Sequence, residues 1–173
     1  IHADSANPAI DGLSVSGIYL DIPTINSMLI DGDDTVQDVS FTGCFFRDAV
    51  EDGLKVGSSV TVEGCQVAGC SFSGATEMAV NWTSQTSSNV MFAGTMFRDN
   101  LGDDTTTTEF YYDGDGLTMT GSAFDGGWAS GVCITLGSNS SQCNVIGNNF
   151  LATTNGTDIT DSGTGNTAVV QSG

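Results

Sequence analysis

Six glycines recur along this chain at intervals of 25 to 27 residues, and each lies in the same short module. In this module one apolar residue is followed two positions later by another, two positions later by glycine, and three positions later by a large apolar residue. The glycines are Gly17, Gly43, Gly69, Gly94, Gly121 and Gly147. A repeat of this regularity over most of a chain is typical of a solenoid, in which each repeat forms one coil stacked on the last.

The apolar positions of the module predict β-strands, because alternate residues of a strand face the same side. Two columns before the glycine are expected to face inward. The first contains Leu13, Val39, Cys65, Val90, Leu117 and Cys143. The second contains Val15, Phe41, Val67, Phe92, Met119 and Val145. The column after the glycine contains Leu20, Phe46, Phe72, Phe97, Phe124 and Phe150, so its five phenylalanines are expected to form one aromatic stack.

A second strand is predicted about ten residues after each module. Its apolar pairs are Met28 and Ile30, Leu54 and Val56, Val80 and Trp82, and Val132 and Ile134. Small residues precede these pairs, namely Ser27, Gly53, Ala79 and Gly131. The fourth repeat differs, because Thr105–Thr108 lie where apolar residues are expected and are followed by Glu109, Phe110, Tyr111 and Tyr112. We expect this repeat either to bulge or to present Phe110, Tyr111 and Tyr112 as a contact surface.

These patterns predict an all-β fold, a right-handed parallel β-helix with six to seven coils of roughly 26 residues. The period-two spacing, the β-branched residues and the Gly, Ser, Thr, Asn and Asp between them favour strands over helices. We expect a single domain over residues 1–173, in which residues 163–173 form a loose tail or a partial coil. Successive coils would stack about 4.8 Å apart.

The module resembles the right-handed parallel β-helix repeat of pectin-degrading enzymes and phage tailspikes. The resemblance is carried by Val39–Phe46 (VSFTGCFF), Val90–Phe97 (VMFAGTMF) and Cys143–Phe150 (CNVIGNNF). Polygalacturonase-like members carry Asn-Thr-Asp, an Asp pair, Gly-His-Gly and Arg-x-Lys, and pectate-lyase-like members use calcium carboxylates with a basic residue. The Asn-Thr-Asp, Gly-His-Gly and Arg-x-Lys motifs are absent from this sequence, and its one histidine, His2, precedes the repeats. The resemblance therefore implies the fold and a non-catalytic member of the family.

The charge balance limits the possible partners. The 21 acidic residues outnumber three basic ones, giving a formal net charge of −18. Such a chain repels nucleic acid and anionic membranes, so we expect neither as a partner. An acidic exterior is typical of proteins in salt water or outside the cell. A Ca²⁺ site is the alternative, with Asp31, Asp33, Asp113 and Asp115 as candidate ligands, although their turns do not complete an EF-hand loop.

Four aspartates are the candidates for catalysis if the chain is an enzyme: Asp33, Asp34, Asp113 and Asp115. Two carboxylates about 5 to 10 Å apart can hydrolyse a glycosidic bond. These aspartates lie in Gly-rich segments, where Asp is also favoured because it hydrogen-bonds the turn backbone. The turn role is the interpretation that we favour.

The three basic residues include two in one column. Arg47 is expected beside Asp21 and Arg98 beside Asp125, each in a cross-strand ion pair of structural character.

The five cysteines include no CxxC pair and no zinc spacing. Cys44 and Cys70 follow the bend glycine one coil apart and are expected as stacked free thiols, because neighbouring parallel strands give unfavourable disulfide torsions. Cys65 and Cys143 are expected inside the coil as small apolar residues, and Cys133 has no obvious partner.

We expect a non-enzymatic structural or attachment protein, most simply a capsid decoration, turret, spike or tail-fibre module on a virion surface or another extracellular surface. Its expected partners are further copies of itself in a homotrimer, a larger assembly that covers the terminal coils, and a host-surface glycan. Two alternatives remain: a polysaccharide-processing enzyme or a fragment of one, and a glycan-binding adhesin with Phe110, Tyr111 and Tyr112 as its platform. No cofactor other than Ca²⁺ is expected.

Overall fold

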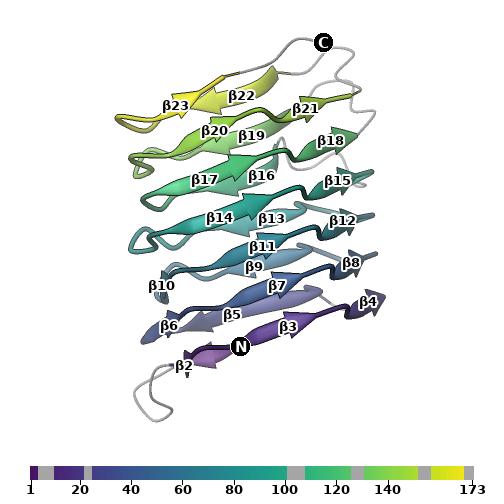
Figure 1. Ribbon diagram of the computed structural model, residues 1–173, viewed down its shortest axis with the longest axis vertical. Coiled ribbons are helices and arrows are strands. Elements are labelled where there is room, and N and C mark those ends of the chain that lie inside the picture. Colours follow the sequence, from purple (N-terminus) through teal and green to yellow (C-terminus); the bar gives the residue numbers. More distant parts are fainter. Residues whose placement is uncertain (4–9, 22–24, 101–107, 126–130, 152–156, 170–173) are drawn as a thin grey trace.

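The computed structural model describes residues 1–3, 10–21, 25–100, 108–125, 131–151 and 157–169. The chain forms an all-β parallel solenoid of about five turns, with about 26 residues per turn (Figure 1). This is slightly fewer turns than the six to seven expected. The two-residue strands at the ends of the stack, β1 (His2–Ala3) and β23 (Thr167–Ala168), belong to incomplete turns. The described residues contain no helix that is long and apolar enough to cross a membrane.

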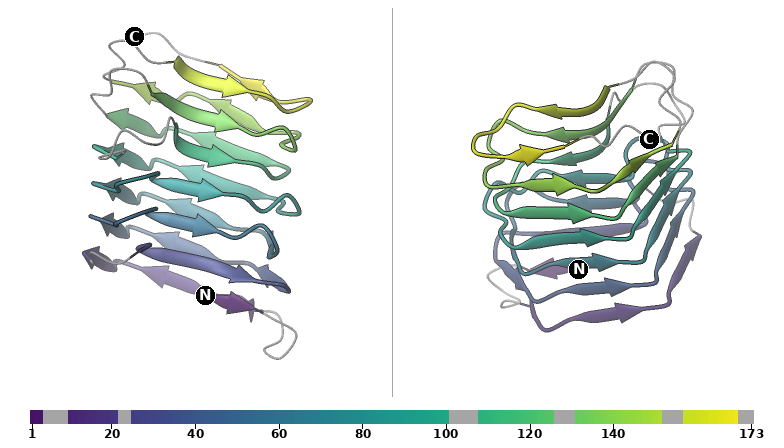
Figure 2. Two further views of the ribbon diagram at one scale, coloured as in Figure 1. Left: turned by 180° about the vertical axis from the view of Figure 1, so that it is seen from behind. Right: turned by 45° about the horizontal axis from the view of Figure 1, so that its top comes forward.

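Three long sheets and one short sheet run along the solenoid (Figures 1 and 2). Sheet I contains β1, β5 (Met28–Gly32), β9 (Leu54–Val56), β13 (Val80–Trp82), β16 (Thr108–Tyr112), β19 (Val132–Leu136) and β22 (Thr157–Asp161). Sheet II contains β3 (Ser14–Ser16), β7 (Ser40–Thr42), β11 (Gln66–Ala68), β14 (Val90–Ala93), β17 (Leu117–Thr120), β20 (Asn144–Ile146) and β23. Sheet III contains β4 (Tyr19–Asp21), β8 (Phe45–Arg47), β12 (Ser71–Ser73), β15 (Met96–Arg98), β18 (Ala123–Asp125) and β21 (Asn149–Phe150). The short sheet contains β2 (Ile10–Asp11), β6 (Thr35–Gln37) and β10 (Thr61–Glu63).

The six repeat glycines form the bend between sheet II and sheet III. All six have a positive φ, between 57° and 67°. A Cβ on Gly43 or Gly69 would meet no atom within 4 Å, so lack of space does not explain these glycines. The left-handed backbone conformation does, because residues with a Cβ adopt it at an energetic cost.

The predicted inward columns are confirmed. Val67 pairs with Phe41 and Phe92 in sheet II, and Phe72 pairs with Phe46 and Phe97 in sheet III. The phenylalanine rings form a nearly parallel stack, with interplanar angles of 9° to 16°. The centroid distances are 4.5 Å for Phe46–Phe72, 5.5 Å for Phe72–Phe97, 4.5 Å for Phe97–Phe124 and 5.3 Å for Phe124–Phe150.

The predicted second strand has the expected apolar pair in the first three repeats, whereas in the fifth the strand is present but its apolar pair is shifted by two residues. Ile134 pairs with Phe110, and Leu136 with Tyr112, so the apolar pair of the fifth repeat is Ile134 and Leu136 and not Val132 and Ile134. Phe110 and Tyr112 supply the apolar pair of the fourth repeat, in register with Val80 and Trp82. The connection before β16 is longer than those in earlier repeats, so distance from the glycine no longer locates the strand. Thr105–Thr107 lie outside the described residues.

Small polar side chains and cysteines line the inner corner directly after the bend. Cys44, Cys70, Thr95, Ser122 and Asn148 occupy successive turns of this corner and are all buried. The Cys44 N–H donates to Cys70 Sγ (3.4 Å), and the Ser122 N–H donates to Asn148 Oδ1 (3.0 Å). Their side chains thus satisfy backbone groups that the sheets leave free at the corner. All five cysteines are buried free thiols, as predicted for Cys44 and Cys70.

Candidate functional site

A slot opens on the outer face of sheet III because one turn carries smaller side chains than the turns on either side. Phe45–Asp48 (FFRD) and Met96–Asp99 (MFRD) lie in the neighbouring turns, and Ser71–Gly74 (SFSG) lies between them. In the sheet register Ser71 is flanked by Phe45 and Met96, and Ser73 is flanked by Arg47 and Arg98. The middle turn has the same inward phenylalanine, Phe72, but its outward residues Ser71 and Ser73 are smaller than those of the neighbouring turns.

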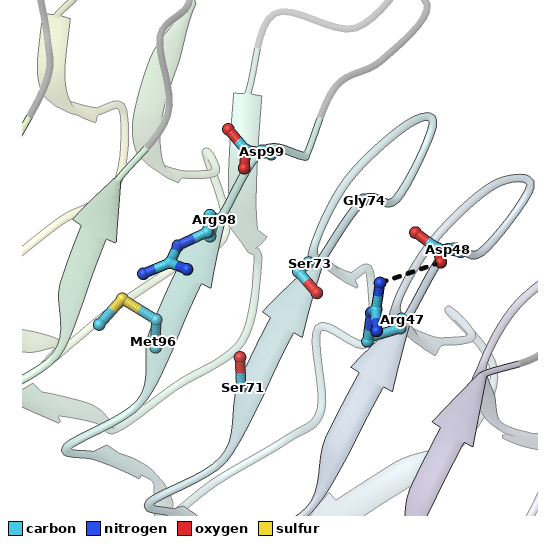
Figure 3. Close-up of a pocket in the computed structure, with 8 residues that line it drawn as sticks. All are labelled: Arg47, Asp48, Ser71, Ser73, Gly74, Met96, Arg98 and Asp99. Atoms are coloured by element: carbon cyan, nitrogen blue, oxygen red, sulfur yellow. Dashed lines mark ion pairs between the residues drawn. The ribbon is translucent and has the colours of Figure 1, made fainter.

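This slot has a volume of about 370 Å³ (Figure 3). It is lined by Arg47, Asp48, Ser71, Ser73, Gly74, Met96, Arg98 and Asp99. The flanking strands are two rungs apart, roughly 10 Å. The slot therefore occupies the width of one turn between two turns with larger outward side chains.

Gly74 completes the floor of the slot. It lies in the same corner column as Asp48 and Asp99, and all three residues have positive φ values, of 70°, 52° and 50°. A Cβ at Gly74 would collide with Asp48 Oδ1, so the carboxylate of Asp48 leans over the space that a larger residue would fill.

The two walls carry both signs of charge. Arg47 forms an ion pair with Asp48 (Nη2 to Oδ2, 3.5 Å), and its Nη1 donates to the Tyr19 hydroxyl. That hydrogen bond, the charge interaction with Tyr19 and then Asp48 raise the pKa of Arg47 above its usual value. Arg98 pairs with Asp125 (Nε to Oδ2, 3.5 Å). Figure 3 shows the Arg47 guanidinium turned toward Asp48 and the Arg98 guanidinium extending on the side of Met96.

The predicted ion pair of Arg98 with Asp125 is thus confirmed, and that of Arg47 changes partner. Asp21 does lie beside Arg47 in the register, but the ion pair forms with Asp48, the next residue along the chain. Both arginine side chains remain about half exposed, at 44% and 53%. Each guanidinium has five N–H donors, so the two partners of Arg47 and the ion pair of Arg98 do not use all the donors of either side chain.

Aromatic rings extend the slot along the same face. Tyr19 and Phe45 are 52% and 47% exposed, and their ring centroids lie 5.9 Å apart. They share the outward column of Ser71 and Met96, whereas the arginines share the column of Ser73. Along the strand direction, the slot therefore passes from the apolar side chain of Met96 to the cationic arginines and then to the anionic Asp48 and Asp99.

The candidate catalytic aspartates are distributed over different turns. Asp31 and Asp113 directly follow the paired residues Ile30 and Tyr112, which are three rungs apart in sheet I, so roughly 14 Å separates the turn of the first acidic cluster from that of the second. This exceeds the spacing of the two carboxylates of a glycosidase. Asp34 Oδ1 accepts a hydrogen bond from the Thr35 N–H (2.8 Å), which is a turn role.

The second acidic cluster links one turn to the next. Asp113 is 5% exposed and accepts two hydrogen bonds from Asn139, one from its N–H (2.9 Å) and one from its side-chain amide (2.8 Å). Asp115 Oδ1 accepts a hydrogen bond from the Ser141 hydroxyl (2.7 Å). Both carboxylates therefore have structural partners in the next turn.

The predicted aromatic contact surface is mostly inside the protein. Phe110 and Tyr112 are fully buried, and the Tyr112 hydroxyl donates to the Asp115 carbonyl (2.9 Å). Burial also raises the pKa of Tyr112. Tyr111 alone of the three is partly exposed, because it alternates with its neighbours along β16. A platform made of all three rings is not present.

The candidate calcium ligands do not converge. Asp31 and Asp33 lie in the first turn, and Asp113 and Asp115 in the fourth. Within the described ranges, no group of three or more His, Cys, Asp or Glu side chains is arranged to hold a metal ion.

Sequence reasoning missed the slot because it treated each arginine as one half of a separate ion pair. The signal available was the recurrence of Phe-Arg-Asp at the same place in two repeats, with Phe-Ser-Gly in the repeat between them. A comparison of the chain with family models, curated proteins and solved structures finds no match. The likeness to the β-helix family therefore rests on the repeat and on the solenoid.

Proposed function

We propose that this protein is a non-enzymatic attachment protein, a rigid β-solenoid that binds a saccharide in the slot on sheet III. The slot itself is the observation that carries the proposal. It brings two of the chain's three basic residues into one groove of a protein whose formal net charge is −18.

The chemistry of the slot suits a sugar ring. The hydroxyl groups of a sugar both donate and accept hydrogen bonds, so they can donate to Asp48 or Asp99 and accept from Arg47 or Arg98. The C–H face of a sugar ring is apolar and would pack on Phe45. A concave site with an apolar side and a few fixed polar groups is typical of small-ligand recognition.

The rest of the solenoid supports a passive scaffold role. The phenylalanine stack and the inner corner fix each turn against the next. The exposed slot residues come from strands and from strand ends, which hold side chains more firmly than long loops do.

The setting that we propose is the surface of a virion or another extracellular surface, with the solenoid as part of a spike, turret, tail fibre or capsid decoration. This setting and a homotrimeric assembly follow from the resemblance to tailspike repeats. Neither is required for the slot to bind a sugar.

The test is a screen of the purified protein against immobilised neutral and acidic glycans, with and without Ca²⁺. Ser73→Arg, which would fill the slot, should abolish binding of the glycans that the unmodified protein retains. Ser16→Arg adds the same side chain at an exposed position of β3 on sheet II and should bind normally.

Retention of no glycan by the unmodified protein, or equal binding by both arginine variants, would refute the saccharide proposal. Release of shorter oligosaccharides into solution, lost in Asp113→Asn, would favour the enzyme alternative.

A further inference from the structure

Asn100 joins the floor of the slot to its wall. It is 2% exposed and directly follows Asp99 in the wall. Its Oδ1 accepts a hydrogen bond from the Ala75 N–H (3.1 Å), and its Nδ2 donates to the Phe72 carbonyl (3.3 Å). Phe72 and Ala75 flank Ser73 and Gly74 in the chain. Asn100 therefore hydrogen-bonds the backbone on both sides of the two residues that form the slot floor.

The same amide nitrogen also donates to Glu109 Oε1, at 2.6 Å. Glu109 is fully buried, and it directly precedes Phe110 as Gly53 and Ala79 precede the equivalent residues Leu54 and Val80. A carboxyl group thus lies at an inner corner position where the earlier turns have a glycine or an alanine.

The second oxygen of this carboxyl group lacks a partner. Glu109 Oε2 is buried and makes no hydrogen bond in the structure described, and Asp158 Oδ1 on β22 is in the same state. An ionised carboxylate in this position would have one hydrogen bond and no access to water, which is unfavourable.

The titratable groups near Glu109 do not offset a negative charge. Asp99 beside β15 and Asp125 on β18 are both acidic and act on Glu109. Cys133 on β19 is buried and interacts electrostatically with Glu109 and with Asp158 on β22, and β13 contributes Ala79. Burial first, then the nearby carboxylates, raise the pKa of Glu109 to about 8 despite the opposing bond from Asn100.

We propose that neutral Glu109 keeps this corner closed, with Asn100 holding the slot floor, and that loss of the proton favours an open corner in which water reaches the carboxylate and the slot floor loosens. This regulation rests on the proposed function for its meaning, because a loosened floor would weaken saccharide binding. The coupling itself requires no ligand, so it can be tested separately.

The direction of the pH effect follows from linkage. When the corner opens, Glu109 returns to an ordinary pKa near 4.5, whereas in the closed corner its pKa is about 8. Between these values opening releases a proton, so opening becomes about tenfold more favourable for each pH unit of increase. Below this window both states hold the proton and above it neither does, so the dependence levels off at both ends.

Amide hydrogen exchange across pH 5 to 9.5, corrected for intrinsic exchange rates, tests the coupling. Peptides that cover residues 71–76 and 96–100 should lose about tenfold in protection per pH unit up to about pH 8 and then level off. Peptides from 28–37, at the other end of the stack, should keep their protection. Glu109→Gln, which is always neutral, should abolish the slope, and Glu63→Gln on the exposed face of β10 should keep it.

Three results would overturn the proposal: no slope in the unmodified protein, the same slope in Glu109→Gln, or equal loss of protection in 28–37. If Glu109→Gln does not fold, ¹³C NMR of the four glutamate carboxyl groups in the unmodified protein decides the matter. One carboxyl titrating near pH 8 supports the proposal, and four midpoints below pH 6 refute it. Glycan retention plays no part in these measurements, so they can fail while the saccharide proposal stands.

Discussion

Replacing Phe97 with alanine tests the central element of the solenoid, the phenylalanine stack. Phe97 is fully buried and lies between two parallel rings, Phe72 and Phe124, at centroid distances of 5.5 and 4.5 Å. Phe110 contacts it edge-on at 5.9 Å, and Phe92 lies 6.4 Å away. The ring thus has aromatic neighbours in the turns before and after it and across the core.

The expected cost is set by burial and by the cavity that remains. Truncation of a buried phenylalanine costs about 3–5 kcal/mol, and a site that cannot collapse lies toward the upper end. Because the surrounding rings are fixed by strands paired on both sides, we expect Phe97→Ala to lose about 4–5 kcal/mol. For a chain of this size, a loss of about 4 kcal/mol lowers the melting temperature by roughly 8–16 °C.

Thermal melting followed by far-ultraviolet circular dichroism, with urea unfolding at 25 °C, measures this loss. The matched control is Phe150→Ala at the end of the same stack, where the ring is only partly buried and stacks on Phe124 at 5.3 Å. We expect the control to lose less than half as much as Phe97→Ala. An equal or larger loss in the control would show that the stack is not continuous through Phe97.

Further predictions concern thiols, backbone conformation and the second acidic cluster. All five thiols should resist an aromatic disulfide reagent in the native protein and react fully in denaturant, because all five are buried and the reagent cannot reach them; rapid reaction of any native thiol would contradict the packing. Gly74→Ala and Gly94→Ala should destabilise the protein by similar amounts, since both glycines have a positive φ and the exposed Asp48 carboxylate that a Cβ at Gly74 would meet can rotate away; calorimetry showing a much larger loss for Gly74→Ala would contradict this reasoning. Asp113→Asn should lower the free energy of unfolding in urea by about 1–3 kcal/mol, because its two hydrogen bonds with Asn139 would be weakened or mismatched. An unchanged free energy of unfolding would show that these bonds contribute little to stability.

The sequence predicted the parts of the fold that repeat. The bend glycines, the inward columns and the phenylalanine stack follow from a fixed spacing, and such spacing is visible without coordinates. Val132 was misplaced by two residues because connections at the corner before sheet I vary in length and carry no periodic signal. Glu109 was missed for the same reason, since its burial depends on the register of β16.

The slot was not predicted because it arises from residues that are small. Ser71, Ser73 and Gly74 have no chemistry that marks a site on its own. Their effect depends on the bulk of the two neighbouring turns, which becomes adjacent only after the coils stack. The partner of Arg47 was equally hidden, because a register places Cα atoms side by side but does not fix the direction of a long side chain.

The in-register stack makes each turn removable as a unit. Excising the segment 65–89 would join the second repeat to the fourth with every inward column still aligned, because Val90 would take the place of Cys65. The shortened protein would hold Arg47 and Arg98 on adjacent rungs, about 5 Å apart at their backbones. Such a chain would keep its phenylalanine core but would lack Ser71, Ser73 and Gly74, the floor of the slot. A single deletion would therefore remove the proposed binding site and leave the fold in place.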